Sequence, residues 1–153
     1  MRVALLVNMT RPNAYNVACD VIGELKRLKV KVYIQRELSE FFSDCGCEFG
    51  NSEDCIRNCD AVISVGGDGT IIHSAQSAVE FDKPILGINA GRLGFLAGLE
   101  KSELGLLCKL VTEDSRVDKR MRLSVKHYEG EELINEYTCL NDCDDIQVIQ
   151  GSL

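Results

Sequence analysis

Residues 61–70 read Ala-Val-Ile-Ser-Val-Gly-Gly-Asp-Gly-Thr, and they decide the fold class of the chain. The apolar run 61–65 is typical of a strand buried on both faces of a parallel sheet. Three glycines follow, and a helix is predicted from about Thr70 to Val79. In α/β folds ligands bind at the carboxyl ends of strands, where glycines let the backbone approach a phosphate and helix N-termini attract anions. The stretch therefore predicts a phosphate site on an α/β fold.

The glycine-rich loop differs from the commonest nucleotide-binding motifs. No Gly-Lys-Ser/Thr follows as in a P-loop, and the glycine spacing is not G-x-G-x-x-G. Thr70 is expected to cap the helix. A tight turn in which Asp68 tolerates unusual backbone angles is the alternative, but the buried strand before the loop favours a binding site.

Strand and helix patterns alternate before and after this loop. Short apolar runs predict strands at 2–8, 31–35 and 84–89, and apolar spacings of three and four predict a helix over 13–28. This order indicates a parallel, Rossmann-like sheet with helices on both faces and right-handed crossovers. Residues 37–60 hold seven acidic side chains and one basic residue, so we expect a peripheral, solvent-facing excursion with short helical pieces.

The pattern changes after Gly98. A helix is expected over 101–113, with Ser102 as its cap, and then 123–128 and 133–140 alternate apolar and polar residues around a Glu-Gly-Glu turn. A third alternating run covers 145–149. The sequence predicts an α/β nucleotide-binding domain over 1–115, followed by the start of a truncated antiparallel β domain over 116–153.

Composition excludes several classes of protein. The 153 residues hold 17 Lys and Arg against 24 Asp and Glu, for a net charge of −7, and no basic stripe suited to nucleic acid. No apolar run approaches the roughly 20 residues that span a bilayer, and no signal peptide is recognisable. We therefore expect a cytoplasmic protein whose eight cysteines are free thiols. A metal site formed by four of them stays open: Cys45, Cys47, Cys55 and Cys59.

Three stretches together resemble the NAD kinase family. Residues 66–70, Gly-Gly-Asp-Gly-Thr, are similar to a loop shared by NAD kinases, diacylglycerol-type lipid kinases and phosphofructokinases. Residues 89–96, Asn-Ala-Gly-Arg-Leu-Gly-Phe-Leu, resemble the N-x-G-x-L-G-F-L stretch of NAD kinases. Residues 140–142, Leu-Asn-Asp, resemble a family Asn-Glu pair, with Asp in place of Glu. The three matches occur in family order.

The resemblance implies transfer of the terminal phosphoryl group of ATP, or of polyphosphate, to the 2′-hydroxyl of the adenosine ribose of NAD. Asp68 would accept the hydroxyl proton as the transition state develops, and magnesium would offset phosphate charge. No residue is assigned as a metal ligand. The family pattern assigns phosphate binding to Gly66, Gly67, Gly69 and Thr70, and NAD binding to Asp68, Gly69, Phe95, Asn141 and Asp142.

Each assignment outside the Gly66–Thr70 loop has an alternative. Phe95 and Leu96 could belong to the core, Asn141 and Asp142 to a turn, and His73 is expected to be a helix-face residue rather than a base. The resemblance also implies a later Gly/Ser/Thr-rich motif, which this sequence lacks. The alternatives for function are an inactive or partner-dependent nucleotide-binding fragment, and less favoured, a lipid or sugar kinase. The family pattern leaves a homo-oligomer open.

Overall fold

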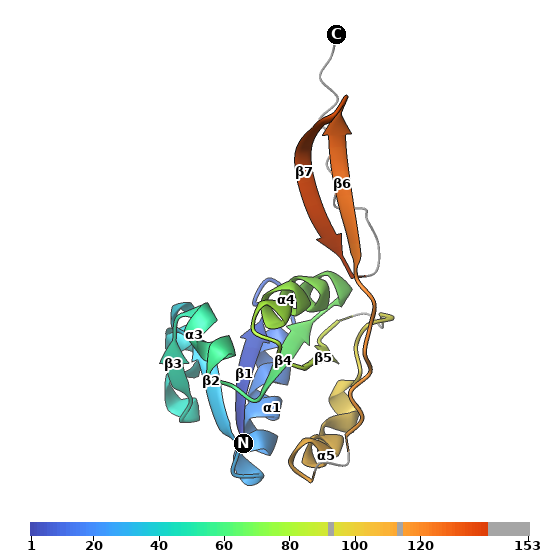
Figure 1. Cartoon of the computed structure of the whole chain (residues 1–153). Helices are drawn as coiled ribbons and strands as arrows, with labels where there is room; N and C mark the ends of the chain where they lie inside the picture. The colour runs from blue at the N-terminus through green and yellow to red at the C-terminus, as the bar shows by residue number, and fades with distance from the viewer. Residues whose placement is uncertain (92–93, 113–114, 141–153) are drawn as a thin grey trace. The chain divides into compact units, whose positions relative to one another are not determined.

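The computed structural model describes residues 1–91, 94–112 and 115–140. The chain divides into two compact units, Met1–Val117 and Asp118–Leu153, each with its own sheet (Figure 1). Among the described helices, none combines the length and the apolar character needed to cross a membrane.

The first unit is built on a five-stranded parallel sheet. Its strands are β1 Arg2–Val7, β2 Lys31–Gln35, β3 Glu48–Gly50, β4 Ala61–Gly66 and β5 Ile85–Asn89, in the order β3-β2-β1-β4-β5. Val3 pairs with Val32 of β2 on one side and with Ala61 of β4 on the other. The strand order therefore reverses between β1 and β4, which is the topological switch point where open α/β sheets bind ligands. The predicted Rossmann-like parallel sheet is confirmed.

Helices cover both faces of this sheet, as the sequence predicts (Figure 1). Helix α1, Ala14–Arg27, and the 3₁₀ helix η3, Lys101–Leu107, pack on the face that carries Val3 and Leu5. Helices α3, Ser52–Arg57, and α4, Asp68–Glu80, pack on the face that carries Ala4 and Leu6. Alternate residues of β1 thus enter opposite cores, which explains why the whole strand is apolar.

The segment that follows β2 is more integrated than its acidic composition predicts. It contains η1 Arg36–Leu38, α2 Ser39–Phe42, η2 Ser43–Cys45, the edge strand β3, and α3. Phe42 is fully buried, and its ring lies 5.5 Å from that of Tyr15 on α1. The expectation of a solvent-facing excursion was therefore wrong in part, because one face of this segment completes the core.

Two helix starts differ from the sequence prediction. Helix α4 begins at Asp68 with Gly67 as its N-cap, so Thr70 lies inside the first turn and does not cap it. The helical segment after Gly98 is η3 followed by α5, Cys108–Val111, and Glu100 rather than Ser102 caps it. Glu100 forms a capping box with Glu103, whose carboxylate accepts the Glu100 amide at 2.9 Å.

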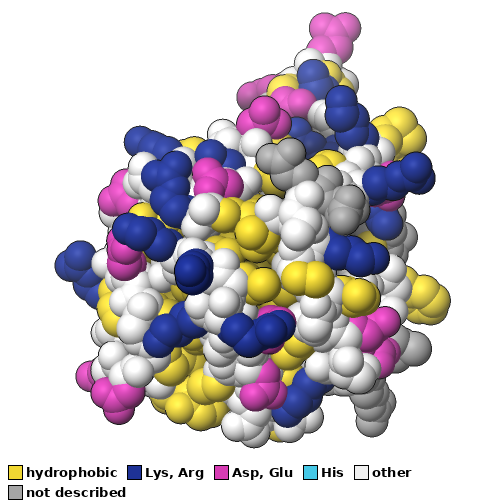
Figure 2. Space-filling model, turned by 90° about the horizontal axis from the view of Figure 1, so that it is seen from below, with side chains coloured by type: hydrophobic (Ala, Val, Ile, Leu, Met, Phe, Trp, Pro, Cys, Tyr) yellow, Lys and Arg dark blue, Asp and Glu magenta, His cyan; other side chains and the backbone are white. Residues whose placement is uncertain are grey.

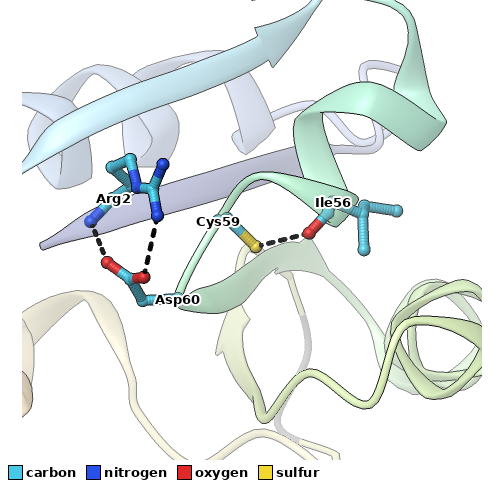
Figure 3. Close-up of polar contacts among 4 residues, drawn as sticks. All are labelled: Arg2, Ile56, Cys59 and Asp60. Carbon is cyan, nitrogen blue, oxygen red and sulfur yellow. Dashed lines mark hydrogen bonds and ion pairs between the residues drawn. The ribbon is translucent and has the colours of Figure 1, made fainter.

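A polar clamp joins the amino ends of β1 and β4 (Figure 3). The Arg2 amide donates to Asp60 Oδ2 at 2.7 Å, and Arg2 Nη2 lies 3.5 Å from Asp60 Oδ1. The Arg2 amide is the largest cause of a lowered pKa for Asp60. Figure 2 views the chain from this end, where Lys and Arg side chains are interspersed with Asp and Glu. The described residues of this face therefore carry charges of both signs.

The second unit contains a β-hairpin. Strands β6, Leu123–Glu129, and β7, Glu132–Cys139, pair antiparallel, and Gly130 occupies the turn with φ +63°. This hairpin and its turn are the ones predicted from the alternating pattern. Several of its apolar side chains are exposed: Leu123, Tyr128, Leu133, Ile134 and Tyr137. The third alternating run, 145–149, lies outside the described residues.

Candidate functional site

The glycine-rich loop lies where β4 ends and α4 begins, at the switch point of the sheet. The first N–H groups of a helix have no acceptor within it. The Ile71 amide is the first that donates, to the Gly67 carbonyl at 3.1 Å, so the amides before it are available to a ligand. With 13 residues, α4 also has enough aligned peptide dipoles to attract an anion at this end. The loop can therefore hold a phosphate group.

Gly66 is required by close packing at this junction. A Cβ built on Gly66 would lie 2.6 Å from both Cβ and Oγ1 of Thr70, a distance that real Cβ atoms do not show. Gly69, in contrast, has open space around its Cα on the side where a Cβ would point. Glycine thus suits these two positions for different reasons. At residue 66 a side chain would collide with Thr70, whereas at residue 69 its absence leaves the loop accessible.

Asp68 connects the loop to the second stretch of the family pattern. Its Oδ2 accepts the Phe95 amide at 2.9 Å, and its Oδ1 accepts the Leu96 amide at 3.1 Å. A Cβ on Gly94 would lie 2.6 Å from the Asp68 carboxyl carbon, so the segment can approach only because residue 94 is glycine. Asp68 thus binds residues that lie 27 and 28 positions later in the sequence, and the two motifs meet at its carboxylate.

Phe95 contributes its backbone to this contact and leaves its ring free. The side chain is 94% exposed, so the alternative that Phe95 belongs to the core was wrong; Leu96 is half-buried. An exposed ring beside the Asp68 carboxylate is available to stack on a ligand. His73 lies exposed on α4, as expected of a helix-face residue.

Asn8 contacts the loop, although the sequence pattern places it only at the end of the strand predicted over 2–8. It follows β1, and its amide donates to the Val65 carbonyl at 3.1 Å. Its side-chain Nδ2 donates to Thr70 Oγ1 at 2.9 Å. Asn8 therefore ties the end of β1 to the first turn of α4 across the switch point. Its position at the carboxyl end of a predicted strand, next to that of β4, is the signal that could have identified it.

Two further polar contacts hold the surrounding elements. Ser64 on β4 and Ser74 on α4 share a buried hydrogen bond of 2.8 Å between their hydroxyl groups, which fixes the helix on the sheet. Asn89, at the end of β5, is buried and accepts the Gly91 amide on Oδ1 at 3.0 Å. The side chain that begins the second motif thus holds the backbone at Gly91. Neither contact follows from the spacing of apolar residues, so sequence patterns alone miss both.

The four cysteines considered for metal binding do not converge. Cys55 and Cys59 are buried on the face of the sheet covered by α3 and α4, whereas Cys45 and Cys47 pack on the face covered by α1. The buried thiols donate to carbonyls, as Cys59 does to Ile56 at 3.1 Å (Figure 3). Burial raises the pKa of Cys47 to about 11, which disfavours the thiolate that metals bind. No cluster of three metal-ligating side chains occurs in the described part of the chain.

Asn141 and Asp142 lie outside the described residues, so their assignment to NAD binding stays a prediction. Of the remaining predicted site residues, five form one continuous junction between strand and helix, and Phe95 joins it through its amide. The junction comprises Gly66, Gly67, Asp68, Gly69 and Thr70.

Comparison with known proteins gives concordant results. The family model of the ATP-NAD kinase N-terminal domain matches residues 3–116. The NAD kinase of Saccharophagus degradans is 33% identical over 141 residues, which cover 92% of this chain and 48% of that protein. The NAD kinase of Moorella thermoacetica is 33% identical over 143 residues, covering 92% and 45%. The chain thus spans about half the length of the curated relatives it matches.

A solved structure shares the fold. The crystal structure of yeast NADH kinase complexed with NADH superposes with a TM-score of 0.74 at 19% identity, covering 91% of this chain and 46% of that one.

Proposed function

The chain belongs to the ATP-NAD kinase family, and on that premise we propose that it transfers the terminal phosphoryl group of ATP to the 2′-hydroxyl of the adenosine ribose of NAD. The products are ADP and NADP. The observation that carries the proposal is the convergence of the Gly66–Thr70 loop and the Gly94–Leu96 segment on the Asp68 carboxylate. Polyphosphate as donor and NADH as acceptor stay open.

Asp68 is proposed as the proton acceptor. A carboxylate has about four acceptor sites, and the two amides occupy one on each oxygen. The remaining sites can accept the ribose hydroxyl. As the hydroxyl oxygen forms a bond to the terminal phosphorus, the bond from that phosphorus to the bridging oxygen of ADP breaks, and the proton moves to Asp68. The amides hold the carboxylate in the orientation that this transfer requires.

The other residues bind the substrates. The backbone amides of Gly67, Gly69 and Thr70 are proposed to contact phosphate oxygens, and Gly66 keeps the loop close to Thr70. Phe95 is proposed to stack near the adenine of NAD, as its 94% exposure permits. Asn141 and Asp142 are proposed to contact the adenine and a ribose.

A magnesium ion is proposed to accompany the nucleotide. Magnesium is commonly held by one or two carboxylates together with substrate phosphates, so a dedicated cluster of protein ligands is not needed. Asp68 is the acidic residue of the glycine-rich loop and retains acceptor sites that fit such a role. When bound, the ion would neutralise charge on the phosphates.

Enzyme assay tests the proposal. The chain is incubated with ATP, magnesium and NAD, and NADP is quantified. Asp68→Asn should reduce the rate by about 10²–10⁴-fold, the usual contribution of general base catalysis. Asp44→Asn, at an exposed position on η2, is the control and should retain the wild-type rate. An Asp68→Asn variant with undiminished activity would contradict the role of Asp68.

A second candidate is a partner-dependent nucleotide-binding unit, favoured by the exposed apolar side chains of β6 and β7. A two-stranded sheet is seldom stable by itself, so a homo-oligomer or another β segment is the proposed partner. This candidate predicts ATP binding by calorimetry without NADP formation by the isolated chain. Phosphorylation of a diacylglycerol or a sugar, with indifference to NAD, would instead favour the lipid or sugar kinases.

The family assignment also supports two broader proposals. We propose a cytoplasmic location and a division at residues 115 and 116 into a nucleotide-binding domain and the beginning of a β domain. Fractionation of the source cells and limited proteolysis between the two units test them.

A further inference from the structure

Arg11, in the loop between β1 and α1, lies against the glycine-rich loop. A Cβ built on Gly67 would be 3.7 Å from Arg11 Nη2 and 4.0 Å from its Cζ, so the guanidinium covers the N-cap of α4. The side chain is exposed, and among the residues that the structure describes its guanidinium has neither an ion pair nor a hydrogen bond. A cation thus stands unpaired beside the proposed phosphate loop.

Hydrogen bonds hold the backbone on both sides of Arg11. Asn8 Oδ1 accepts the amide and the hydroxyl of Thr10 at 3.1 and 2.6 Å. The Arg11 amide donates to the Asn8 carbonyl, and the Ala14 amide donates to the Arg11 carbonyl, each at 3.1 Å. Because Asn8 also binds Thr70 across the switch point, the position of Arg11 is linked to that of the glycine-rich loop.

The electrostatics of this pair favour an anion. The N-terminus of α4 carries partial positive charge, and a guanidinium beside it has the same sign. The two repel one another in the absence of a ligand, and an anion placed between them converts the repulsion into two attractions. Arg is also suited to phosphate, since its planar guanidinium can donate two parallel hydrogen bonds.

We propose that Arg11 binds a phosphate group of the nucleotide donor, opposite the amides of the Gly66–Thr70 loop. In this arrangement the phosphate lies between the loop that follows β1 and the first turn of α4. This inference rests on the proposed function, because it supplies a residue to the same donor site.

Binding measurements test this role separately from catalysis. The full chain is titrated calorimetrically with MgATP, with inorganic tripolyphosphate and with adenosine. Arg11→Gln should weaken ATP and tripolyphosphate binding by about tenfold or more, and adenosine binding should not change. Arg11→Lys keeps the charge but not the planar donor pair, so it should fall between. Arg36→Gln is the matched control, because Arg36 also follows a parallel strand of this sheet.

The outcomes separate the two proposals. Equal ATP binding by wild type and Arg11→Gln would overturn the role of Arg11 and leave the proposed function intact. An equal loss in Arg36→Gln would also overturn it, since a general charge effect would explain the result. No binding of ATP or tripolyphosphate by wild type would overturn both proposals. A specific Arg11 effect without any NADP formation would support the phosphate contact and contradict the kinase activity of the chain.

Discussion

Gly94 lies so close to Asp68 that a Cβ at residue 94 would be 2.6 Å from the carboxyl carbon of Asp68. The glycine is therefore needed for contact between two segments. It lets the amides of Phe95 and Leu96 reach the carboxylate oxygens. The orientation of the proposed proton acceptor depends on a residue that has no side chain.

Gly94→Ala should consequently impair the site. Either the Asp68 carboxylate or the segment after residue 94 must move, and the proposed kinase activity should fall at least tenfold, while the fold is retained. The measurement is NADP formation, together with circular dichroism. Gly105→Ala is the control, because a Cβ there meets no atom within 4 Å. Full activity of Gly94→Ala would show that the contact does not orient Asp68.

Gly66 and Gly69 should respond oppositely to the same substitution. Gly66→Ala brings a Cβ to 2.6 Å from the Thr70 side chain, and overpacking of this kind costs about 1–3 kcal/mol. Gly69→Ala meets no atom within 4 Å and lies in the first turn of α4, so its stability should be unchanged or slightly higher. Urea unfolding of both variants measures the difference. Equal destabilisation would show that the Thr70 contact is unimportant.

Phe95→Ala should weaken NAD binding while leaving the stability of the fold almost unchanged. Because the ring is 94% exposed, its removal should change the free energy of unfolding by less than about 0.5 kcal/mol. Loss of stacking on the adenine should weaken NAD binding by roughly two- to tenfold. Calorimetric titration with NAD measures this, with Phe41→Ala on α2 as the control for an exposed Phe. Unchanged NAD affinity would remove Phe95 from the site.

Asp60→Asn should destabilise the first unit in a pH-dependent way. Its pKa is lowered in the folded protein, so the stabilisation is complete above the unfolded value of about 3.9 and is lost as the pH falls through the lower folded pKa. The side chain is 46% exposed, so we expect at most about 1 kcal/mol at pH 7. Urea unfolding between pH 3 and 7 should show the deficit shrinking toward acid. A deficit independent of pH would exclude the ionised carboxylate as its cause.

Cys47 should react slowly with alkylating reagents in the folded protein. Burial raises the pKa of its thiol to about 11 from the ordinary value of 9.0, which reduces the thiolate fraction roughly a hundredfold at neutral pH. Iodoacetamide labelling, resolved by residue with mass spectrometry, should proceed about a hundredfold faster in urea. Equal rates in folded and unfolded protein would show that Cys47 is accessible and normally acidic.

The sequence predicts those parts of the fold in which apolar patterning determines the structure. Strand β2 begins and ends where its pattern predicts. Strand β4 is recognisable as a nearly continuous apolar run, which reflects the burial of all its residues. The edge strand β3 escapes prediction, since it has only three residues and pairs with β2 through its backbone. Phe42 is likewise buried within an acidic segment, where local composition gives no indication of the packing.

As with the fold, only part of the site could be predicted from the sequence. The loop and the second motif could be identified by residue type, but their meeting at Asp68 depends on two backbone amides, whose directions no sequence pattern encodes. The role of Asn8 also depends on strand order, because β1 and β4 become neighbours only through the reversal at the switch point. Residue types predict candidates, whereas the topology determines which of them meet.

The same strand order affects how the chain folds during synthesis. Val3 pairs with Ala61, 58 residues later, so the central strand pair cannot form until β4 has been made. At about 5–20 residues per second, the apolar β1 waits several seconds for that partner. Pairing across such a separation is also intrinsically slow. During this interval the apolar β1 has only β2 beside it, and its other edge has no strand to pair with.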